Sequence, residues 1–182
     1  MSHSDSPRLL FISPVPPNRT GNGLAMRAAA MLEALSERFR IHLFAPGPVS
    51  PALAAVCAGG CPLPSPRYDR LARALRGRRA SPPEWCRPSR RTVRRVLSHT
   101  EGMRFDHVHV FRLYMMPLAE AVCRKRAAPH ARIHLDLDDI ESDSRVRMAR
   151  FADSPRDRLR FERDAAFYAE QEAAWLPRCD RV

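Results

Sequence analysis

Apolar runs and amphipathic stretches alternate in the first quarter of the chain. Residues 8–13 (RLLFIS) and 41–45 (IHLFA) are short apolar runs that end at prolines, which is the pattern of buried strands. Residues 24–39 between them have apolar side chains at steps of three and four, the spacing of one face of an amphipathic helix. Asn22 stands where the N-cap of that helix is expected. The order strand, helix, strand predicts a β-α-β unit, from which parallel sheets with helices on both faces are built.

The rest of the chain continues this alternation less regularly. We expect a short helix at 53–56 that Gly59-Gly60 ends, a strand at 107–111, a helix at 115–126, a strand at 132–137 and a long helical stretch over the last third. The polar-then-apolar end Asp180-Arg181-Val182 would open a further strand, so the domain looks cut short there. We therefore expect one α/β domain over residues 1–182, Rossmann-like, with a mostly parallel sheet and helices on both faces.

Positive charge gathers in one part of the sequence. The chain has 182 residues and a net charge of +11, and residues 62–100 supply +9 of that charge through eleven arginines against two acids. Residues 67–79 and 90–98 each place apolar side chains on one side and arginines around the rest, which predicts a basic helical insertion at 62–100. A solvated face, an anionic membrane surface and a nucleic acid are the three interpretations of this segment. It offers only Tyr68 and Trp85 to stack on bases, so we expect no nucleic-acid partner.

Composition also indicates the class of protein and its cellular location. Hydrophobic residues make up 45% and charged residues 28%, which argues against a disordered or fibrous chain. No apolar run resembles a signal peptide or approaches the roughly 20 residues of a spanning helix. We expect a cytoplasmic protein, peripheral on the inner face of the cell membrane if the basic helices bind lipid. The cysteines are odd in number and lack paired spacing, and His107 and His109 alone do not make a metal site, so we expect reduced thiols and no metal.

Two glycines open the first predicted helix. The stretch from Gly21 to Met26 (GNGLAM) invites a dinucleotide-binding interpretation, but Met26 stands where the third glycine is needed and no acid follows the second strand. A more limited binding role is still consistent with the sequence: Gly21 and Gly23 could bring backbone N–H groups close to a phosphate or a sugar. The alternative is a loop whose glycines serve only its turn.

Acidic residues follow the strand predicted at 132–137. Asp136-Leu137-Asp138-Asp139 is similar to the nucleophile motif of haloacid-dehalogenase-type phosphatases, but no lysine follows it, which argues against that chemistry. Acids at the carboxyl end of a strand lie where open α/β sheets place ligand contacts. Capping of the next helix by Asp139 or Ser142 is the alternative.

Several of these stretches carry a family resemblance when they are taken in order. They are Phe11-Ile12-Ser13-Pro14-Val15-Pro16-Pro17, then Gly21-Asn22-Gly23 with Arg27, then 105–112 (FDHVHVFR), 136–142 (DLDDIES) and 172–182. Together they resemble the N-terminal half of a GT-B-fold glycosyltransferase of family 4, over nearly the whole chain.

The resemblance implies a retaining transferase of the hexosyltransferase type that moves a sugar from a nucleotide-sugar to a glycan or lipid-linked acceptor, without a metal or other cofactor. In the family the N-terminal domain mainly binds the acceptor, and its Gly-rich loop approaches the donor phosphate and the transferred sugar. These binding roles would fall on Gly21, Asn22 and Gly23, with Arg27 and Arg112 beside them. Many members have a histidine after the strand that here precedes the acids. The candidates for the polar group at the reaction centre are therefore Asp138, Asp139, Glu141 and His109.

The nucleotide pocket of the family belongs to a C-terminal domain. We expect this chain to lack it and a separately encoded C-terminal domain to complete the enzyme. Half a cleft cannot align donor and acceptor, so we expect no appreciable transferase activity from the polypeptide alone. The alternative functions are a non-catalytic binding domain and a membrane-surface adaptor that uses the basic helices of residues 62–100.

Overall fold

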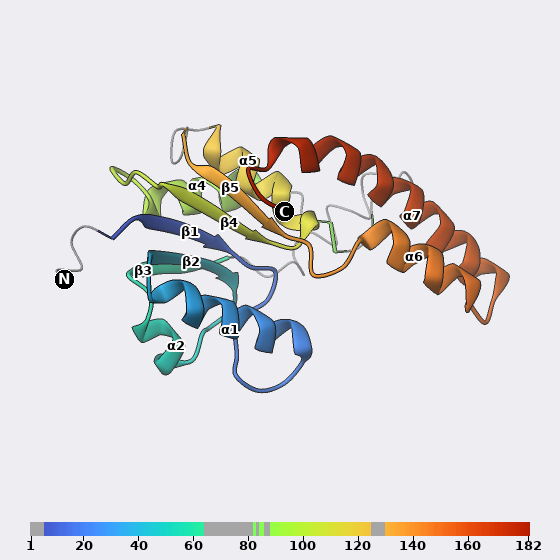
Figure 1. The fold of residues 1–182 in the computed structure, drawn as a ribbon, viewed down its shortest axis with the longest axis horizontal. Helices are drawn as coiled ribbons and strands as arrows, with labels where there is room; N and C mark the ends of the chain where they lie inside the picture. The colour runs from blue at the N-terminus through green and yellow to red at the C-terminus, as the bar shows by residue number, and fades with distance from the viewer. Residues whose placement is uncertain (1–5, 64–81, 83, 86–87, 125–129) are drawn as a thin grey trace.

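Five parallel strands form the centre of the computed structural model (Figure 1). The structure describes residues 6–63, 82, 84–85, 88–124 and 130–182. The strands are β1 Arg8–Ile12, β2 Arg40–Pro46, β3 Gly59–Leu63, β4 His107–Phe111 and β5 Arg132–Asp136. The α-helices are α1 Gly23–Ser36, α2 Pro51–Ala55, α4 Arg90–His99, α5 Met116–Cys123, α6 Glu141–Arg150 and α7 Pro155–Trp175. Short 3₁₀ helices, η2 Leu113–Met115 and η3 Leu176–Arg178, precede α5 and follow α7.

The strand order is β3-β2-β1-β4-β5, and every neighbouring pair is parallel. The chain begins at β1 in the middle, adds β2 and β3 on one side, and then returns to add β4 and β5 on the other. Parallel strands need crossover connections, and these connections place helices on both faces of the sheet. The expected α/β, Rossmann-like fold is thus confirmed.

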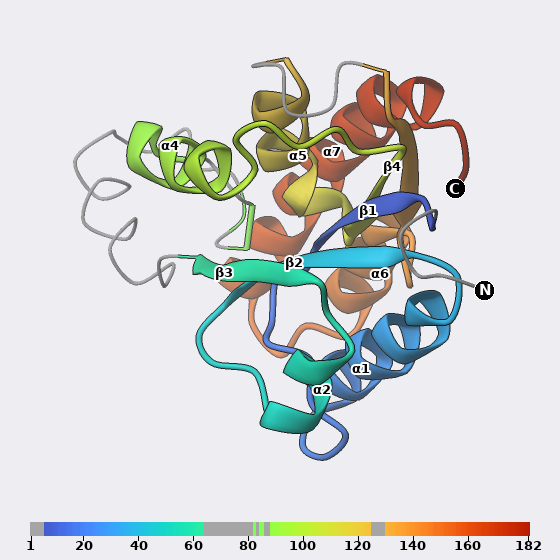
Figure 2. The same cartoon turned by 90° about the vertical axis from the view of Figure 1, so that its left-hand side faces the viewer.

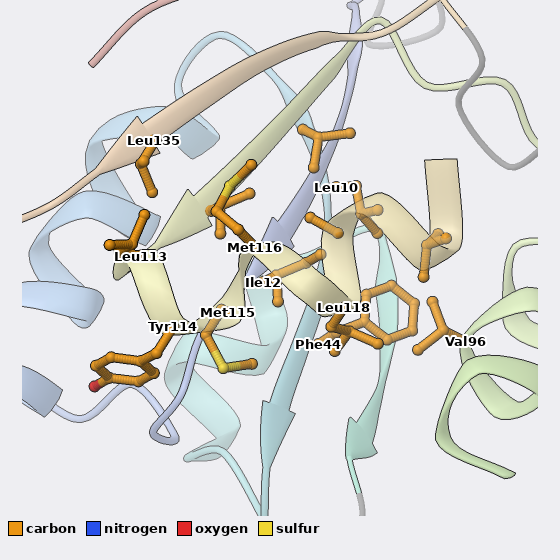
Figure 3. Close-up of a cluster of buried hydrophobic side chains, with 14 of the residues drawn as sticks. Leu10, Ile12, Phe44, Val96, Leu113, Tyr114, Met115, Met116, Leu118 and Leu135 are labelled. Atoms are coloured by element: carbon orange, nitrogen blue, oxygen red, sulfur yellow. The ribbon is translucent and has the colours of Figure 1, made fainter. Parts of the chain in front are cut away.

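Each face of the sheet packs a separate hydrophobic core. In the view of Figure 2, α1 and α2 lie on one side of the sheet and α4, α5 and α7 on the other. Leu9 and Phe11 point from β1 toward α1, whereas Leu10 and Ile12 point into the larger core beneath α5. Figure 3 shows part of that larger core, where side chains of α5 and η2 meet those of β1 and β5. Because successive residues of a strand face opposite sides, a strand buried on both faces is apolar along its buried length, as residues 9–12 of β1 are.

Strand β3 was not predicted. The sequence suggested that Gly59-Gly60 merely ends a helix, and the segment GGCPL has few residues of high strand propensity. Gly60 has a φ of +149°, and a Cβ atom there would lie 2.0 Å from the backbone oxygen of Leu43. The glycine therefore permits β3 to approach β2, which is a reason for its presence that only the pairing of the two strands reveals.

The last third of the chain contains two helices where we predicted one helical stretch. Helix α6 ends at Arg150 and α7 begins at Pro155. The hydroxyl of Ser154 accepts a hydrogen bond from the Asp157 N–H at 3.1 Å, and Pro155 occupies the first turn of α7, which suits a residue without an N–H. The two helices pack against each other as a hairpin, with their connection at the end of the molecule far from the start of β1 (Figure 1).

The basic segment is described only in part. Helix α4 buries Val93 and Val96 and leaves its arginines outside, as expected for residues 90–98. The helix predicted at 67–79 lies outside the described residues. Trp85 is buried and packs edge-on against Phe167 of α7, with ring centroids 5.1 Å apart, so its ring is not available to stack on a base.

The C-terminal residues run beside β5. The Asp180 N–H donates to the Ile133 carbonyl at 2.9 Å, and the Leu135 N–H donates to the Arg181 carbonyl at 3.0 Å. Residues 180 and 181 therefore lie beside β5, with one parallel bridge between His134 and Arg181.

The cysteines in the described part of the chain are free thiols: Cys57, Cys61, Cys123 and Cys179. Cys86 lies outside that part. None of the described helices is both long enough and apolar enough to span a bilayer.

Candidate functional site

The carboxyl ends of β1, β4 and β5 form one edge of the sheet. The chain leaves β1 for α1 on one face and leaves β4 for α5 on the other, so the direction of winding reverses between these adjacent strands. Open α/β sheets bind ligands just outside such a reversal. The residues that follow these strands are therefore the first place to look for a site.

A cluster of opposite charges occupies this edge. We define the edge cluster as the side chains of Arg27, Arg112, Asp136, Asp138 and Glu141. Asp138 bridges two guanidinium groups: its Oδ1 lies 2.6 Å from Arg27 Nη1 and its Oδ2 lies 2.7 Å from Arg112 Nη2. Arg27 Nη2 also contacts Asp136 Oδ1 at 3.1 Å, and Arg112 Nη1 contacts Glu141 Oε1 at 3.3 Å. The cluster therefore joins α1, the ends of β4 and β5, and the start of α6.

The cluster is nearly neutral and opens toward solvent on one side. Its two arginines face three carboxylates, and the side chain of Glu141 is the most buried member. Arg27 is the most exposed, with 46% of its side chain accessible. Such an array offers hydrogen-bond donors and acceptors together, without the surplus positive charge of a dedicated phosphate site.

Two members of the cluster have an unusual backbone conformation. Arg112 has a φ of 78° and Asp138 a φ of 61°, and they are the non-glycine residues of positive φ in the part of the chain that is described. The Arg112 N–H donates to the Asp136 carbonyl at 2.7 Å, and the Asp138 N–H donates to Asp136 Oδ1 at 2.9 Å. This conformation costs about 1 kcal/mol or more at a residue with a Cβ and persists where surrounding contacts enforce it, often at functional sites.

A partly buried group of polar side chains continues the cluster toward α7. Arg145 contacts Glu141 Oε2 at 3.5 Å and also Glu84, and the hydroxyl of Tyr168 donates to Glu84 at 3.0 Å. Burial raises the pKa of Glu141, although the guanidinium groups of Arg112 and Arg145 oppose this shift. Burial likewise raises the pKa of the nearby Tyr114 to about 12. These contacts fix α6 and α7 to the sheet and hold Glu141 against Arg112.

The glycine loop lies at the start of α1. The side-chain oxygen of Asn22 accepts a hydrogen bond from the Ala25 N–H at 2.8 Å, so the predicted N-cap is confirmed. Gly21 has a φ of +108°, which requires glycine for the backbone alone. A Cβ atom at Gly21 or Gly23 would meet no atom within 4 Å, which leaves the outer side of the loop open to a ligand. Met26, which takes the place of the third glycine of a dinucleotide-binding motif, is 46% exposed, so its side chain does not obstruct the packing of α1 on the sheet.

His109 lies outside the edge cluster. Its ring is on the α1 face of the sheet, 4.9 Å from that of Phe11, and the residue is only 8% exposed. Burial lowers its pKa to about 4, and Nε2 has no hydrogen-bond partner among the described residues. The next side chain on this face of β4, Phe111, stands between His109 and the carboxyl end of the strand.

Asp139 turns away from the cluster as well. It accepts a hydrogen bond from the Ser144 hydroxyl, which lowers the pKa of Asp139, and it pairs with Arg147 at 3.1 Å. The N-cap of α6 is Ile140, whose side chain accepts no hydrogen bond, so capping by Asp139 or Ser142 is not observed. Of the predicted candidates, the structure brings together Arg27, Arg112, Asp138 and Glu141.

Four polar groups in or next to the cluster were not among the predicted site residues: Asp136, Glu84, Arg145 and Tyr168. Asp136 ends an apolar strand two residues before Asp138, and Arg145 follows Glu141 by one helical turn, so both had a local signal. Glu84 reaches Tyr168 from 84 residues away, and no local pattern announces that contact.

The donor set does not favour a cation. Asp136, Asp138 and Glu141 each contact an arginine, which occupies carboxylate oxygens that a metal ion would need. Within the described ranges, no group of three or more His, Cys, Asp or Glu side chains is arranged to hold a metal.

Comparisons of the chain with protein-family models, with curated protein sequences and with solved structures found no match. What the chain and its structure show together is an α/β fold with a parallel five-stranded sheet and an arginine–carboxylate cluster at the edge where its winding reverses.

Proposed function

We propose that this chain forms the acceptor-side wall of a retaining glycosyltransferase of the GT-B type, and that the edge cluster binds sugar hydroxyl groups. The observation that carries the proposal is Asp138, held with a positive φ between Arg27 and Arg112 at the edge of the sheet. Sugars present neighbouring hydroxyls, each both a donor and an acceptor, and fixed carboxylate–guanidinium pairs match them.

The charge balance supports an acceptor sugar over a donor phosphate at this position. A phosphate would have to displace Asp138 from both arginines, whereas a neutral sugar can bind without breaking their pairing. The open glycine loop at Gly21–Gly23 is the better place for a donor phosphate, because backbone N–H groups at the start of α1 favour an anion there. The two features lie at the same edge of the sheet, as transfer between donor and acceptor requires.

Under this proposal the edge cluster binds the acceptor and does not hold the nucleotide. The nucleotide is held by a second Rossmann-like domain, and the 182-residue polypeptide alone binds sugars without appreciable turnover. Asp138 orients an acceptor hydroxyl, Glu141 fixes Arg112, and no step is assigned to His109 or Asp139.

Sugar binding by the isolated chain tests the proposal. Saturation-transfer NMR with a panel of methyl glycosides and nucleotide-sugars should show contact with at least one glycoside. Asp138→Asn should remove it, because the amide cannot pair with two guanidinium groups while asparagine tolerates the positive φ. Asp143→Asn, at an exposed acid on the first turn of α6, is the matched control and should bind like the parent chain. If no glycoside binds, or if Asp138→Asn binds unchanged, the proposal fails.

A further inference from the structure

The far end of the α6–α7 hairpin carries two bulky apolar side chains that are largely exposed. We define the hairpin tip as residues 147–163. Phe151, at the end of α6, is 83% exposed, and Leu159, one turn into α7, is 67% exposed. Phe151 belongs to the connection between α6 and α7, and Leu159 follows that connection in the sequence. The connection itself projects away from the sheet (Figure 1). Isolated exposed apolar residues are common, but two at one projecting end form a feature that folding does not require.

Positive charge surrounds these apolar residues. The hairpin tip contains six arginines and three carboxylates, a net charge of +3. Arg156, Arg160 and Arg163 recur at helical spacing along one side of α7, where they line a shallow hollow with Ser154 and Asp157. Ion pairs within the tip are exposed ones, such as Arg160 with Asp157 at 3.4 Å and Arg158 with Glu162 at 3.3 Å, and such pairs open easily.

We infer that the hairpin tip binds the surface of an anionic phospholipid membrane. Phe151 and Leu159 enter the boundary between headgroups and acyl chains, and the arginines of α7 contact lipid phosphates. This inference concerns a surface distinct from the edge cluster and does not rest on the proposed sugar binding. It also differs from the membrane binding considered for the basic helices of residues 62–100, because the hairpin tip is another part of the chain.

The shape of the tip favours a membrane over a protein partner. Two separated apolar side chains at a projecting end cover little area, whereas specific protein interfaces bury about 800 Å² on each partner. A fluid bilayer adapts to the end that enters it and supplies many phosphates to a stripe of arginines. A nucleic acid would satisfy the arginines but would leave Leu159 exposed.

Vesicle co-sedimentation of the full chain tests this inference. We expect the chain to bind vesicles of phosphatidylcholine with phosphatidylglycerol more strongly than vesicles of phosphatidylcholine alone, and to lose much of this binding in about 0.5 M salt, where charges are screened within a few ångströms. The double variant Phe151→Ser/Leu159→Ser should weaken binding about tenfold or more. Arg156→Gln/Arg160→Gln should weaken it by about fivefold for each charge removed.

Matched controls lie at the opposite side of the fold. Val56→Ser removes an exposed apolar side chain after α2, and Arg38→Gln removes an exposed arginine after α1, so neither should change binding by more than about twofold. The inference is overturned if no anionic vesicle binds the chain, or if binding occurs but the tip variants leave it intact, which would point to residues 62–100. It is also overturned if sedimentation velocity shows that the tip variants dissolve a dimer, because a second copy would then be the occupant.

Discussion

The α6–α7 hairpin has a root and a tip that differ in how their charged side chains are held. At the root, Glu141 and Arg145 of α6 meet Arg112, which follows β4, and Glu84. Tyr168 of α7 packs among them with no exposed surface. At the tip, Arg158 pairs with Glu162, yet about 64% and 52% of these two side chains remain exposed. Salt bridges at an exposed site contribute little, whereas breaking a buried one leaves a charge without a partner.

The difference shows which charges belong to the fold and which are free for another purpose. At the root, polar side chains bridge the sheet and both helices, so they determine where the hairpin attaches. At the tip, the exposed side chains of Phe151 and Leu159 and the arginines whose ion pairs are exposed contribute little to the fold. The same two helices therefore combine a rigid base with an end whose residues can change at small cost to folding.

The largest effect is expected from truncating the aromatic ring at the root. Tyr168→Ala should lower the free energy of unfolding by about 3–5 kcal/mol, because it empties a fully buried site between α7, Trp85 and the sheet. Tyr168→Phe removes only the hydrogen bond to Glu84 and should cost about 1–2 kcal/mol. Urea unfolding followed by tryptophan fluorescence measures both. A loss below about 1 kcal/mol for Tyr168→Ala would show that the root does not anchor the hairpin.

The pH dependence of stability distinguishes the sheet, which contains a buried histidine, from the hairpin tip, which contains no histidine. The pKa of His109 is lowered to about 4 by burial, while nearby Asp136 acts to raise it and His134 to lower it. The unfolded chain takes up a proton at this residue near pH 6.5 and the folded chain only near pH 4, so stability falls as the pH falls through that window. The loss attributable to His109 approaches about 3 kcal/mol once the pH is below 4.

His109→Leu should flatten this part of the profile, because leucine binds no proton and leaves no ring nitrogen unpaired. The measurement is the urea midpoint of the parent chain and the variant between pH 7 and pH 4. Phe151→Ala at the tip should follow the parent profile throughout. Equal pH dependence of His109→Leu and the parent chain would place the proton uptake elsewhere.

The sequence predicted those features whose cause is local. The N-cap at Asn22 depends on a side chain three residues from its partner, and β4 depends on its own apolar run. Strand β3 has no such signal, because the need for Gly60 comes from the backbone of Leu43 in another strand. The edge cluster could be predicted only in part. Parallel strands bring Arg112 and Asp138 to one edge of the sheet, so their proximity could be anticipated. The hydrogen bond between Tyr168 and Glu84 depends on tertiary packing and could not.

A charge removed at the root should matter more than a similar charge removed near the tip. Arg112→Gln leaves Asp138 and Glu141 without a guanidinium between them, and we expect a loss of about 2 kcal/mol in the free energy of unfolding, less than for a fully buried pair because Asp138 is partly exposed. Arg147→Gln, the matched change at an exposed ion pair, should cost less than about 0.5 kcal/mol. Equal losses in chemical denaturation would remove the distinction between root and tip.

The smallest effect is expected from truncating the aromatic ring at the tip. Phe151→Ala should change the free energy of unfolding by no more than about 0.5 kcal/mol, because the ring is 83% exposed and its removal creates no cavity. The comparison with Tyr168→Ala is direct, since both changes remove an aromatic ring from the same hairpin. A loss above about 1 kcal/mol for Phe151→Ala would mean that the folded protein uses this ring in its own packing, so its exposure would no longer indicate a partner. If the change is neutral, folding does not account for a phenylalanine in this exposed position, and the vesicle experiment then decides whether a lipid surface does.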